Sequence, residues 1–266
     1  MAQAQTQEPT VETIADADLW ETVADGVNTI AHDEAVFEFE PGQFKVVVKD
    51  AANVALIRQT IDADDFEHYD VAGRFATGVN TQRLEDLLKI VDDVPVSFGW
   101  DWDKYKFDFK AGDVEYDLAG IDPDSVRGSP TEVPPVKDEL PYTVDITLPV
   151  DKLKRAYKIV DMNTDHATLR FGGEDAIFVI EGQGDTDASR VTIHDDDAFE
   201  WREDPPANED ICRQANDYIG EVVSILEEDT VRFVTGPECP YHLWTNRADG
   251  RVKTKLMQAP RVDNSK

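Results

Sequence analysis

AVFEFEPGQFKVVVKDAANVALIRQTI, residues 35–61, predicts a β-hairpin followed by a third strand. Apolar and polar side chains alternate in AVFEFE and in QFKVVVKD, which is the two-residue period of a strand with one buried face. Pro41 and Gly42 separate the two runs and supply the turn. The last eight residues, 54–61, continue as a further strand.

The same pattern returns later in the chain. ATLRFGGEDAIFVIEGQGDTDASRVTI, residues 167–193, aligns with the first stretch without a gap at an offset of 132 residues. Six of the 27 pairs are identical, namely Ala35/Ala167, Phe39/Phe171, Val47/Val179, Arg58/Arg190, Thr60/Thr192 and Ile61/Ile193. An internal repeat of this length predicts two similar domains.

The elements around the two copies follow the same order. Amphipathic segments predict helices at residues 18–32 with Asp18 as N-cap, 81–92 with Thr81 as N-cap, 150–162 and 207–226. Further strands are predicted at 74–79, 94–100, 104–109 and 113–118, and then at 188–194, 230–235, 241–245 and 252–258. The fold class is therefore α+β: two similar domains, each with two helices on one face of an antiparallel sheet.

A proline-rich segment separates the two halves. GIDPDSVRGSPTEVPPVKDELP, residues 120–141, contains five prolines, which forbid a long helix and indicate a linker. The predicted organisation is a loose tail at 1–10, an N-terminal domain at 11–119, a connecting loop at 120–141 and a C-terminal domain at 142–262.

The composition is strongly acidic. The 266 residues include 56 Asp and Glu against 26 Lys and Arg, which gives a formal net charge of -30. Such a surface stays soluble and suits a salt-rich cytoplasm, where a short Debye length screens the self-repulsion. No apolar run approaches the roughly 20 residues of a membrane span, and the polar start MAQAQTQEPTVE does not resemble a signal peptide. We expect a cytoplasmic protein.

The two cysteines give little sign of a cofactor site. Cys212 and Cys239 lack CxxC spacing, so they predict no metal framework, although a disulfide between them stays open. We expect no cofactor.

The segment VDKLKRAYKIVDMN, residues 150–163, is the most basic stretch of this acidic chain. On a helical wheel one side carries the apolar residues Val150, Leu153, Ala156, Tyr157 and Val160. The opposite side carries Lys154, Arg155 and Lys158, with Lys152 on the flank. A face of this kind can contact a phosphate backbone without reading bases. A solvated charged face without a ligand is the alternative.

Several ordered motifs resemble one family, the sliding clamps of archaea and eukaryotes of the proliferating-cell-nuclear-antigen type. They are KDAANVALI (49–57), GVNTQRLEDLLKIV (78–91), YDLAGIDPDSVR (116–127), DMNTDHATLRF (161–171), EGQGDTDASRVTI (181–193) and KLMQAPRV (255–262). Together they span most of residues 12–262, and their order and spacing are more specific than any single motif. The acidity resembles that of proteins from a halophilic archaeon or one of its viruses.

The resemblance implies a homotrimeric ring with pseudo-sixfold symmetry around double-stranded DNA, bound without regard to sequence. The four predicted helices would line its channel, and the ring would tether DNA polymerase, the clamp loader and other partner proteins. The implied DNA-contacting residues are Arg83, Lys89, Lys152, Lys154, Arg155, Lys158 and Arg213. The first helix departs from the family, because Glu21, Thr22 and Asn28 stand where lysine is frequent. DNA contact would therefore be thin, and topology would hold the ring on its track.

The resemblance also implies a pocket for short partner peptides under the connecting loop and along the C-terminal strand. The implied residues are Val54, Ile121, Val126, Pro240, Met257, Ala259, Pro260, Arg261 and Val262. Arg261 and Val262 would bind the peptide through their backbone. Ordinary core packing is the alternative for Val54, Ile121 and Met257. Gly120 and Gln258 stand where apolar residues are usual in the family, so partner choice would differ.

The resemblance further implies that ring closure pairs strand 113–118 of one subunit with strand 188–194 of the next. Acidic residues at these edges, Asp113, Glu115 and Asp195–Asp197, would make the ring depend on salt, so that low salt splits it. Alternatively, these acids only cap the strand edges.

Two other functions are compatible with the sequence. His194–Asp197 and Asp161, Asp165 and His166 suggest metal ligands of a hydrolase, but no HExxH, phosphate loop or nucleophile elbow accompanies them. A diverged acidic scaffold that binds clamp partners without encircling DNA is the second alternative, and the first helix without Lys or Arg favours it.

Overall fold

The computed structural model describes residues 10–30, 33–91, 94–127, 140–173, 177–194 and 199–261. These residues form two compact units. The first comprises the described residues of Met1–Val48, Arg58–Thr131 and Ala248–Val252, and the second those of Lys49–Ile57, Glu132–Arg247 and Lys253–Lys266. The domain boundaries 11–119, 120–141 and 142–262 stay a prediction.

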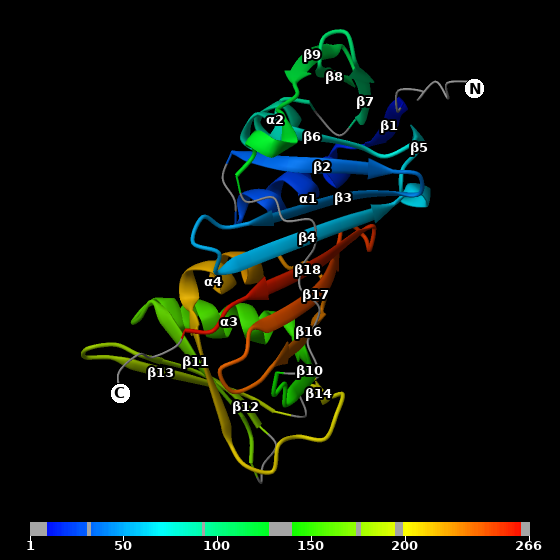
Figure 1. Ribbon diagram of the computed structural model, residues 1–266. Coiled ribbons are helices and arrows are strands. Elements are labelled where there is room, and N and C mark those ends of the chain that lie inside the picture. Colours follow the sequence, from blue (N-terminus) through cyan, green and yellow to red (C-terminus); the bar gives the residue numbers. More distant parts are fainter. Residues whose placement is uncertain are drawn as a thin grey trace. The chain divides into compact units, whose positions relative to one another are not determined.

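The two halves of the chain repeat one order of elements (Figure 1). The first half contains β1 (Thr10–Asp16), α1 (Ala17–Asn28), β2 (Glu34–Glu40), β3 (Gln43–Lys49), β4 (Ala55–Asp62), β5 (His68–Ala72), β6 (Phe75–Asn80), α2 (Thr81–Leu88), β7 (Pro95–Asp101), β8 (Lys106–Ala111) and β9 (Val114–Ala119). The second half contains β10 (Val144–Pro149), α3 (Val150–Asp161), β11 (His166–Gly172), β12 (Ile177–Gln183), β13 (Ala188–Ile193), β14 (Glu200–Trp201), β15 (Asp210–Ala215), α4 (Asn216–Ser224), β16 (Thr230–Thr235), β17 (Tyr241–Arg247) and β18 (Val252–Gln258). Two short 3₁₀ turns complete the list: Ala63–Asp65 follows β4, and Pro123–Ser125 follows β9.

Strand pairing repeats as well. In the first half the neighbouring strands run β5-β1-β7-β8-β9 and β4-β3-β2-β6, and in the second β14-β10-β16-β17-β18 and β13-β12-β11-β15. Adding the predicted offset of 132 residues to the first and last residues of β2 gives the first and last residues of β11. The duplicated, antiparallel α+β fold is therefore confirmed.

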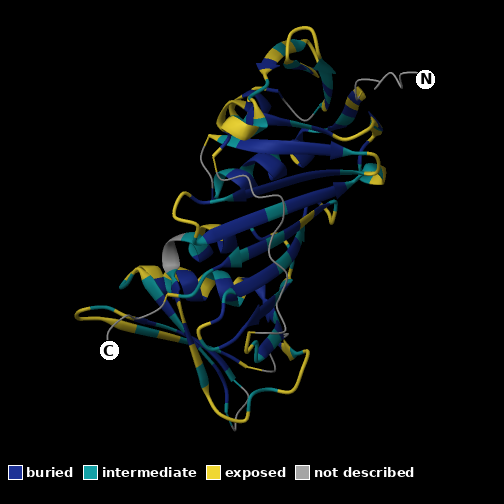
Figure 2. Ribbon diagram, in the orientation of Figure 1, coloured by how far each residue is buried: buried dark blue, intermediate teal, exposed yellow. Residues whose placement is uncertain are grey.

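The first hairpin forms as the alternation predicts. Phe37 lies opposite Val46 and Phe39 opposite Phe44, and the turn residue Gly42 has a φ of 102°, which glycine adopts without strain. Both strands are buried over most of their length (Figure 2). The polar residues Glu38 and Lys45 are buried as well, and their side chains form an ion pair of 3.2 Å across the hairpin.

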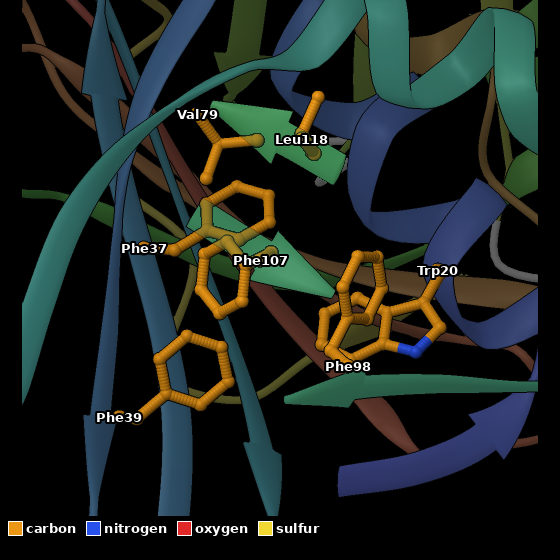
Figure 3. Close-up of a pocket in the computed structure, with 7 residues that line it drawn as sticks. All are labelled: Trp20, Phe37, Phe39, Val79, Phe98, Phe107 and Leu118. Carbon is orange, nitrogen blue, oxygen red and sulfur yellow. The ribbon is translucent and has the colours of Figure 1, made fainter. Parts of the chain in front are cut away.

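An aromatic cluster fills the core of the first unit (Figure 3). The Trp20 ring lies 4.8 Å from Phe98 and 5.3 Å from Phe44, both edge-to-face, and Phe107 packs 5.6 Å from Phe98. Trp20 comes from α1, so this cluster fixes the helix on the sheets that supply the phenylalanines. The space between these rings is too small for a water molecule.

The predicted helix caps were wrong. The side chain of Asp16, not Asp18, accepts the Leu19 N–H at 2.8 Å and begins α1, and Asn80, not Thr81, accepts the Arg83 N–H at 2.7 Å and begins α2. Both helices also end before the predicted 32 and 92, because Thr29 and Lys89 close them.

The segment predicted as one helix at 207–226 divides at Asn216. Its first part is strand β15, paired with β11, in which Cys212 and Gln214 are buried while Arg213 is exposed. A buried amide and thiol in place of aliphatic side chains hide the two-residue period. Strands β1, β5, β10 and β14 were also missed.

A buried histidine makes the second unit sensitive to acid. His242 is 1% exposed, and its Nε2 lies 3.0 Å from the Tyr142 hydroxyl. Burial, with a smaller contribution from the charge of Lys255, lowers the pKa of His242 to about 4. The folded chain therefore keeps this ring neutral at a pH where the unfolded chain, with an ordinary pKa near 6.5, protonates it.

We expect the free energy of unfolding to fall by about 2 kcal/mol between pH 7 and pH 5 on account of His242, because the unfolded state binds one more proton in this range. His242→Gln should remove this slope. Denaturant titrations at both pH values in constant molar salt measure it, with the exposed His68→Gln as matched control. An unchanged slope in His242→Gln would contradict the assignment.

Candidate functional site

Each unit packs its two helices against each other, α1 with α2 and α3 with α4. On α3 the buried residues are Val150, Leu153, Ala156, Tyr157 and Val160, which is the predicted apolar stripe. The basic residues Lys152, Lys154, Arg155 and Lys158 lie outside this stripe, half-buried or exposed. The amphipathic character of α3 is therefore confirmed.

Lys154, Arg155 and Lys158 on α3 differ in what they contact. Arg155 and Lys158 are exposed and form no hydrogen bond or ion pair with the part of the chain that the structure describes. Lys154 instead donates from Nζ to the Leu226 carbonyl at 2.7 Å, just beyond the C-terminal end of α4. A cation at this end is stabilised by the helix dipole, so Lys154 also joins the two helices.

The helices of the first unit present a different charge. The exposed and half-buried positions of α1 carry Asp18, Glu21, Asp25 and Asn28. Asn28 links the helices, because it donates to Glu85 at 2.5 Å and accepts from the Thr81 hydroxyl at 2.7 Å.

The two cations predicted on the second helix also differ. Lys89 pairs with Glu85, and the hydrogen bond between them is the main reason that the pKa of Lys89 is raised. Arg83 is exposed and forms no side-chain hydrogen bond or ion pair with the described residues. On the described helices of the first unit, Arg83 is therefore the one exposed cation that has no side-chain partner among the described residues, whereas α3 has two, Arg155 and Lys158.

Arg213 does not lie on the fourth helix, where it was predicted. It is an exposed residue of β15, opposite Thr168 of β11, and its carbonyl accepts the Arg261 N–H at 2.9 Å. The side chains of 216 and 217 lie outside the description, and the exposed residues of the rest of α4 are Glu221 and Ser224. This helix therefore adds no cation among its described side chains.

The start of the predicted linker is folded. Gly78 and Ile121 exchange two backbone hydrogen bonds of 2.8 Å, and the 3₁₀ turn Pro123–Ser125 follows. Val126 is 7% exposed, whereas Ile121 is half-buried. Residues 128–139 of the predicted loop lie outside the described part.

A buried carboxylate organises the turn that precedes Val54. Asp50 is 3% exposed and accepts the backbone N–H groups of Ala52, Val54 and Ala55 at 2.6–2.8 Å, and the Tyr218 hydroxyl at 2.7 Å. Burial alone would raise the pKa of Asp50, but the hydrogen bonds from Ala55, Tyr218, Ala52 and Val54 outweigh it and lower the pKa. The charged Asp50 side chain therefore connects this turn to α4 by hydrogen bonds.

The C-terminal strand is tied to that turn. The Ala259 N–H donates to the Val54 carbonyl at 2.8 Å, so the structure brings these two predicted residues together. Pro240, Met257 and Pro260 are half-buried and Arg261 is exposed, while Val262 lies outside the described residues. The Arg261 N–H donates to the Arg213 carbonyl at 2.9 Å, so in the predicted backbone contact with a peptide only the Arg261 carbonyl would take part.

Gln258 is a core residue of the second unit. It is fully buried, accepts the Tyr241 hydroxyl at 2.6 Å and donates to the Ala215 carbonyl at 2.8 Å. A buried amide with both groups bonded explains why a polar residue stands there. No sequence pattern predicted the hydrogen bond between Tyr241 and Gln258 or that between Tyr218 and Asp50, because the partners are distant along the chain. Asp50, by contrast, lies in the motif KDAANVALI.

The described residues hold no group of three His, Cys, Asp or Glu side chains that could bind a metal. Asp195–Asp197 lie outside them. Every helix in the described ranges is too short or too polar to traverse a bilayer.

Comparisons with known proteins give one consistent result. No protein-family model matches the sequence. A relative from Haloarcula marismortui, named DNA polymerase sliding clamp, is 28% identical over 253 residues, which cover 94% of this chain and 98% of the relative. A relative of the same name from Archaeoglobus fulgidus is 26% identical over 255 residues, covering 96% and 99%.

Solved structures agree. A structure of the C-terminal region of FEN-1 bound to A. fulgidus PCNA matches with a TM-score of 0.82 and 26% identity, covering 96% of this chain and 100% of that chain. PCNA from Thermococcus kodakaraensis matches with a TM-score of 0.79 at 19% identity, over 95% and 100%, which shows the likeness of fold.

Proposed function

The chain belongs to the PCNA family of sliding clamps, and from this premise we propose that three copies close a ring around duplex DNA and tether DNA polymerase to its template. Domains at 11–119 and 142–262, joined by the loop 120–141, would give the ring pseudo-sixfold symmetry. The chain is a clamp and not an enzyme, so the metal-dependent hydrolase is set aside. We place the ring in a salt-rich cytoplasm, on account of the acidic composition and the halophilic relatives.

The observation that carries this proposal is the amphipathic helix α3 within a duplicated fold. Its apolar stripe is buried in the second unit, and Arg155 and Lys158 are exposed on its other side. A ring needs only a weak, sequence-independent attraction to phosphates, because its closure keeps it on DNA.

Two unlike edges support ring closure. Strand β9 ends one run of paired strands and β13 ends another. Val114 and Tyr116 on β9, and Val191 on β13, are half-buried at these edges. Because the two edges differ, pairing one with the other on the next copy is heterologous and generates a ring when the rotation closes. Arg190 on β13 is exposed and pairs with Glu181 at 2.7 Å within the chain; across the proposed contact it would also face the exposed Glu115 on β9.

Partner peptides are proposed to dock beside the C-terminal strand. In the A. fulgidus complex the C-terminal region of FEN-1 is bound to that organism's PCNA. In this chain the proposed contacts remain Val54, Ile121, Val126, Pro240, Met257, Ala259, Pro260, Arg261 and Val262. The hydrogen bond between Ala259 and Val54 supports the part of this set that lies in the second unit.

Loading on nicked circular DNA in molar salt tests the function. With a clamp loader from a halophilic archaeon, we expect the chain to stay on circles and to escape when the circle is cut to a linear duplex. Equal release from both forms would refute encirclement and favour the non-encircling acidic scaffold, which the full-length similarity to clamps does not favour.

We expect the double substitution Arg155→Gln/Lys158→Gln to weaken binding to a short duplex and to lower the slope of log affinity against log salt by about 2, because two phosphate contacts are lost. Fluorescence anisotropy between low and moderate salt measures both quantities. Lys104→Gln, on the turn after β7, is the matched control. Lys154→Gln should instead lower stability, because its ammonium binds the Leu226 carbonyl. An unchanged slope in the double variant would contradict DNA contact by α3.

A further inference from the structure

The free edge of β6 is covered by the start of the connecting loop. Gly78 on this strand lies opposite Val36 of β2 on one side. On its other side both its N–H and its carbonyl bond to Ile121, at 2.8 Å each, and the Thr77 hydroxyl lies 3.3 Å from the Ile121 carbonyl. The loop therefore begins as a one-residue extension of the sheet.

Two glycines make this approach possible. A Cβ on Gly78 would lie 2.4 Å from Cγ2 of Val126 and 2.8 Å from Cβ of Ile121. A Cβ on Gly120 would lie 2.5 Å from the Trp100 ring and 2.9 Å from the Thr77 hydroxyl. Carbon atoms do not pack this closely, so at either position any side chain would push the loop away.

Residues 120–126 are also stabilised by hydrogen bonds among themselves. The Asp122 carboxylate accepts the Asp124 N–H at 3.0 Å, and its carbonyl accepts the Ser125 N–H at 2.8 Å. The turn places Val126 in the core, against Gly78. A linker that only joined two domains would need none of these contacts. Here they fix a segment that contains two of the proposed partner residues, Ile121 and Val126.

We propose that Gly78 and Gly120 are positioning residues for partner binding: they seat residues 120–126 on β6 and Trp100, and so hold the connecting loop ready for the peptide. This inference rests on the proposed function. A preformed loop raises affinity because less conformational entropy is lost when the peptide docks. The buried Val126 side chain then fixes the loop, and this positions Ile121 for contact with the peptide.

The test is the affinity of the full-length chain for a fluorescent peptide from the C-terminal region of A. fulgidus FEN-1. For Gly78→Ala we expect Kd to rise about tenfold, since preorganisation is lost, while the ring and its retention on circular DNA stay intact. Trypsin should also cleave faster after Arg127, which is exposed at the end of the seat. Gly99→Ala on β7 is the matched control, because its nearest neighbour would lie 4.0 Å from the new methyl group.

A double variant tests the contact itself. Gly78→Ala/Val126→Ala removes the closest clash and should bind the peptide more tightly than Gly78→Ala alone. Should Gly78→Ala fail to fold, Val126→Ala leaves β6 unchanged and is expected to raise Kd about threefold and to speed trypsin cleavage after Arg127, because the loop is loosened. A higher Kd without faster cleavage would mean that Val126 only contacts the peptide, and would overturn its positioning role.

The inference is overturned if wild type and Gly78→Ala bind the peptide equally well, or if Gly78→Ala loses the ring and DNA retention together with the peptide. A wild-type chain that does not bind the peptide refutes instead the partner-binding part of the proposed function. The two failures are therefore distinguished by the wild-type measurement.

Discussion

Val191→Asp on β13 is expected to reduce the proposed ring to single subunits and to abolish retention on circular DNA. The side chain is half-buried at an edge strand, and we propose that β9 of the next subunit covers it. An unpaired carboxylate buried in this contact would cost several kcal/mol. In a single subunit the same side chain still reaches water, so folding should persist.

Sedimentation in molar salt measures the change as a fall from the mass of three chains to that of one, and circular dichroism reports the fold. Gln183→Asp, at the exposed end of β12, is the matched control. Tyr116→Asp on β9 should reproduce the effect from the opposite edge. A Val191→Asp chain that keeps the trimeric mass would refute the assigned edge. Dissociation of the wild-type ring in low salt would agree with the acidic residues at these strand edges.

Asp50→Ala should destabilise the second unit by about 4 kcal/mol and eliminate peptide binding. The substitution leaves three backbone N–H groups and the Tyr218 hydroxyl without their acceptor. The bond to Ala55 is buried and the other three are part-buried, so loss of the first costs up to about 3 kcal/mol and loss of each of the others costs less, because water can replace the acceptor there. The turn would no longer present the Val54 carbonyl to Ala259. Tyr218→Phe removes one of these bonds and should cost about 1 kcal/mol.

Denaturant titration and peptide anisotropy measure the two effects of Asp50→Ala, with the exposed Asp185→Ala as control. The pH dependence adds a second check. Because the folded pKa of Asp50 is lowered, its contribution is complete above the ordinary value of about 4 and is lost as pH falls through the folded pKa. Asp50→Ala should lack that acid-induced loss. Full peptide affinity in this variant would contradict the role of the turn.

The charge on the four helices is unequal between the two units. Asp18, Glu21 and Asp25 lie on α1, whereas α3 carries Arg155 and Lys158. In the proposed ring the backbone would have pseudo-sixfold symmetry, but the attraction to phosphates would come chiefly from one helix of each subunit. We therefore expect weak DNA contact and a ring that depends on closure to remain bound.

Much of the fold follows from patterns in the sequence. The alternation in residues 35–61 and its return at 167–193 predicted the hairpins, and the spacing in 150–162 predicted the buried and charged sides of α3. The resemblance to sliding clamps predicted the family, which the relatives bear out. The assignment of DNA-contacting and peptide-contacting residues stays a prediction.

Other features could not be predicted from local patterns. The strand β15 hides its two-residue period because Cys212 and Gln214 fill its buried positions, and the pairing with β11 makes it a strand. The contact of Lys154 with Leu226 joins residues 72 positions apart, and that of Asp50 with Tyr218 joins residues 168 positions apart.

Local patterns in the amino-acid sequence were enough to predict the duplicated order of helices and strands, the amphipathic face of α3 and the acidic character of the chain. These depend on the period and charge of neighbouring residues, which act before distant segments meet. The folded packing was needed to learn which cations remain exposed, which polar groups are bonded in the core, and why glycine stands at 78 and 120. Each of these depends on the close approach of groups that are far apart in the chain, and only the folded packing brings them within a few ångströms.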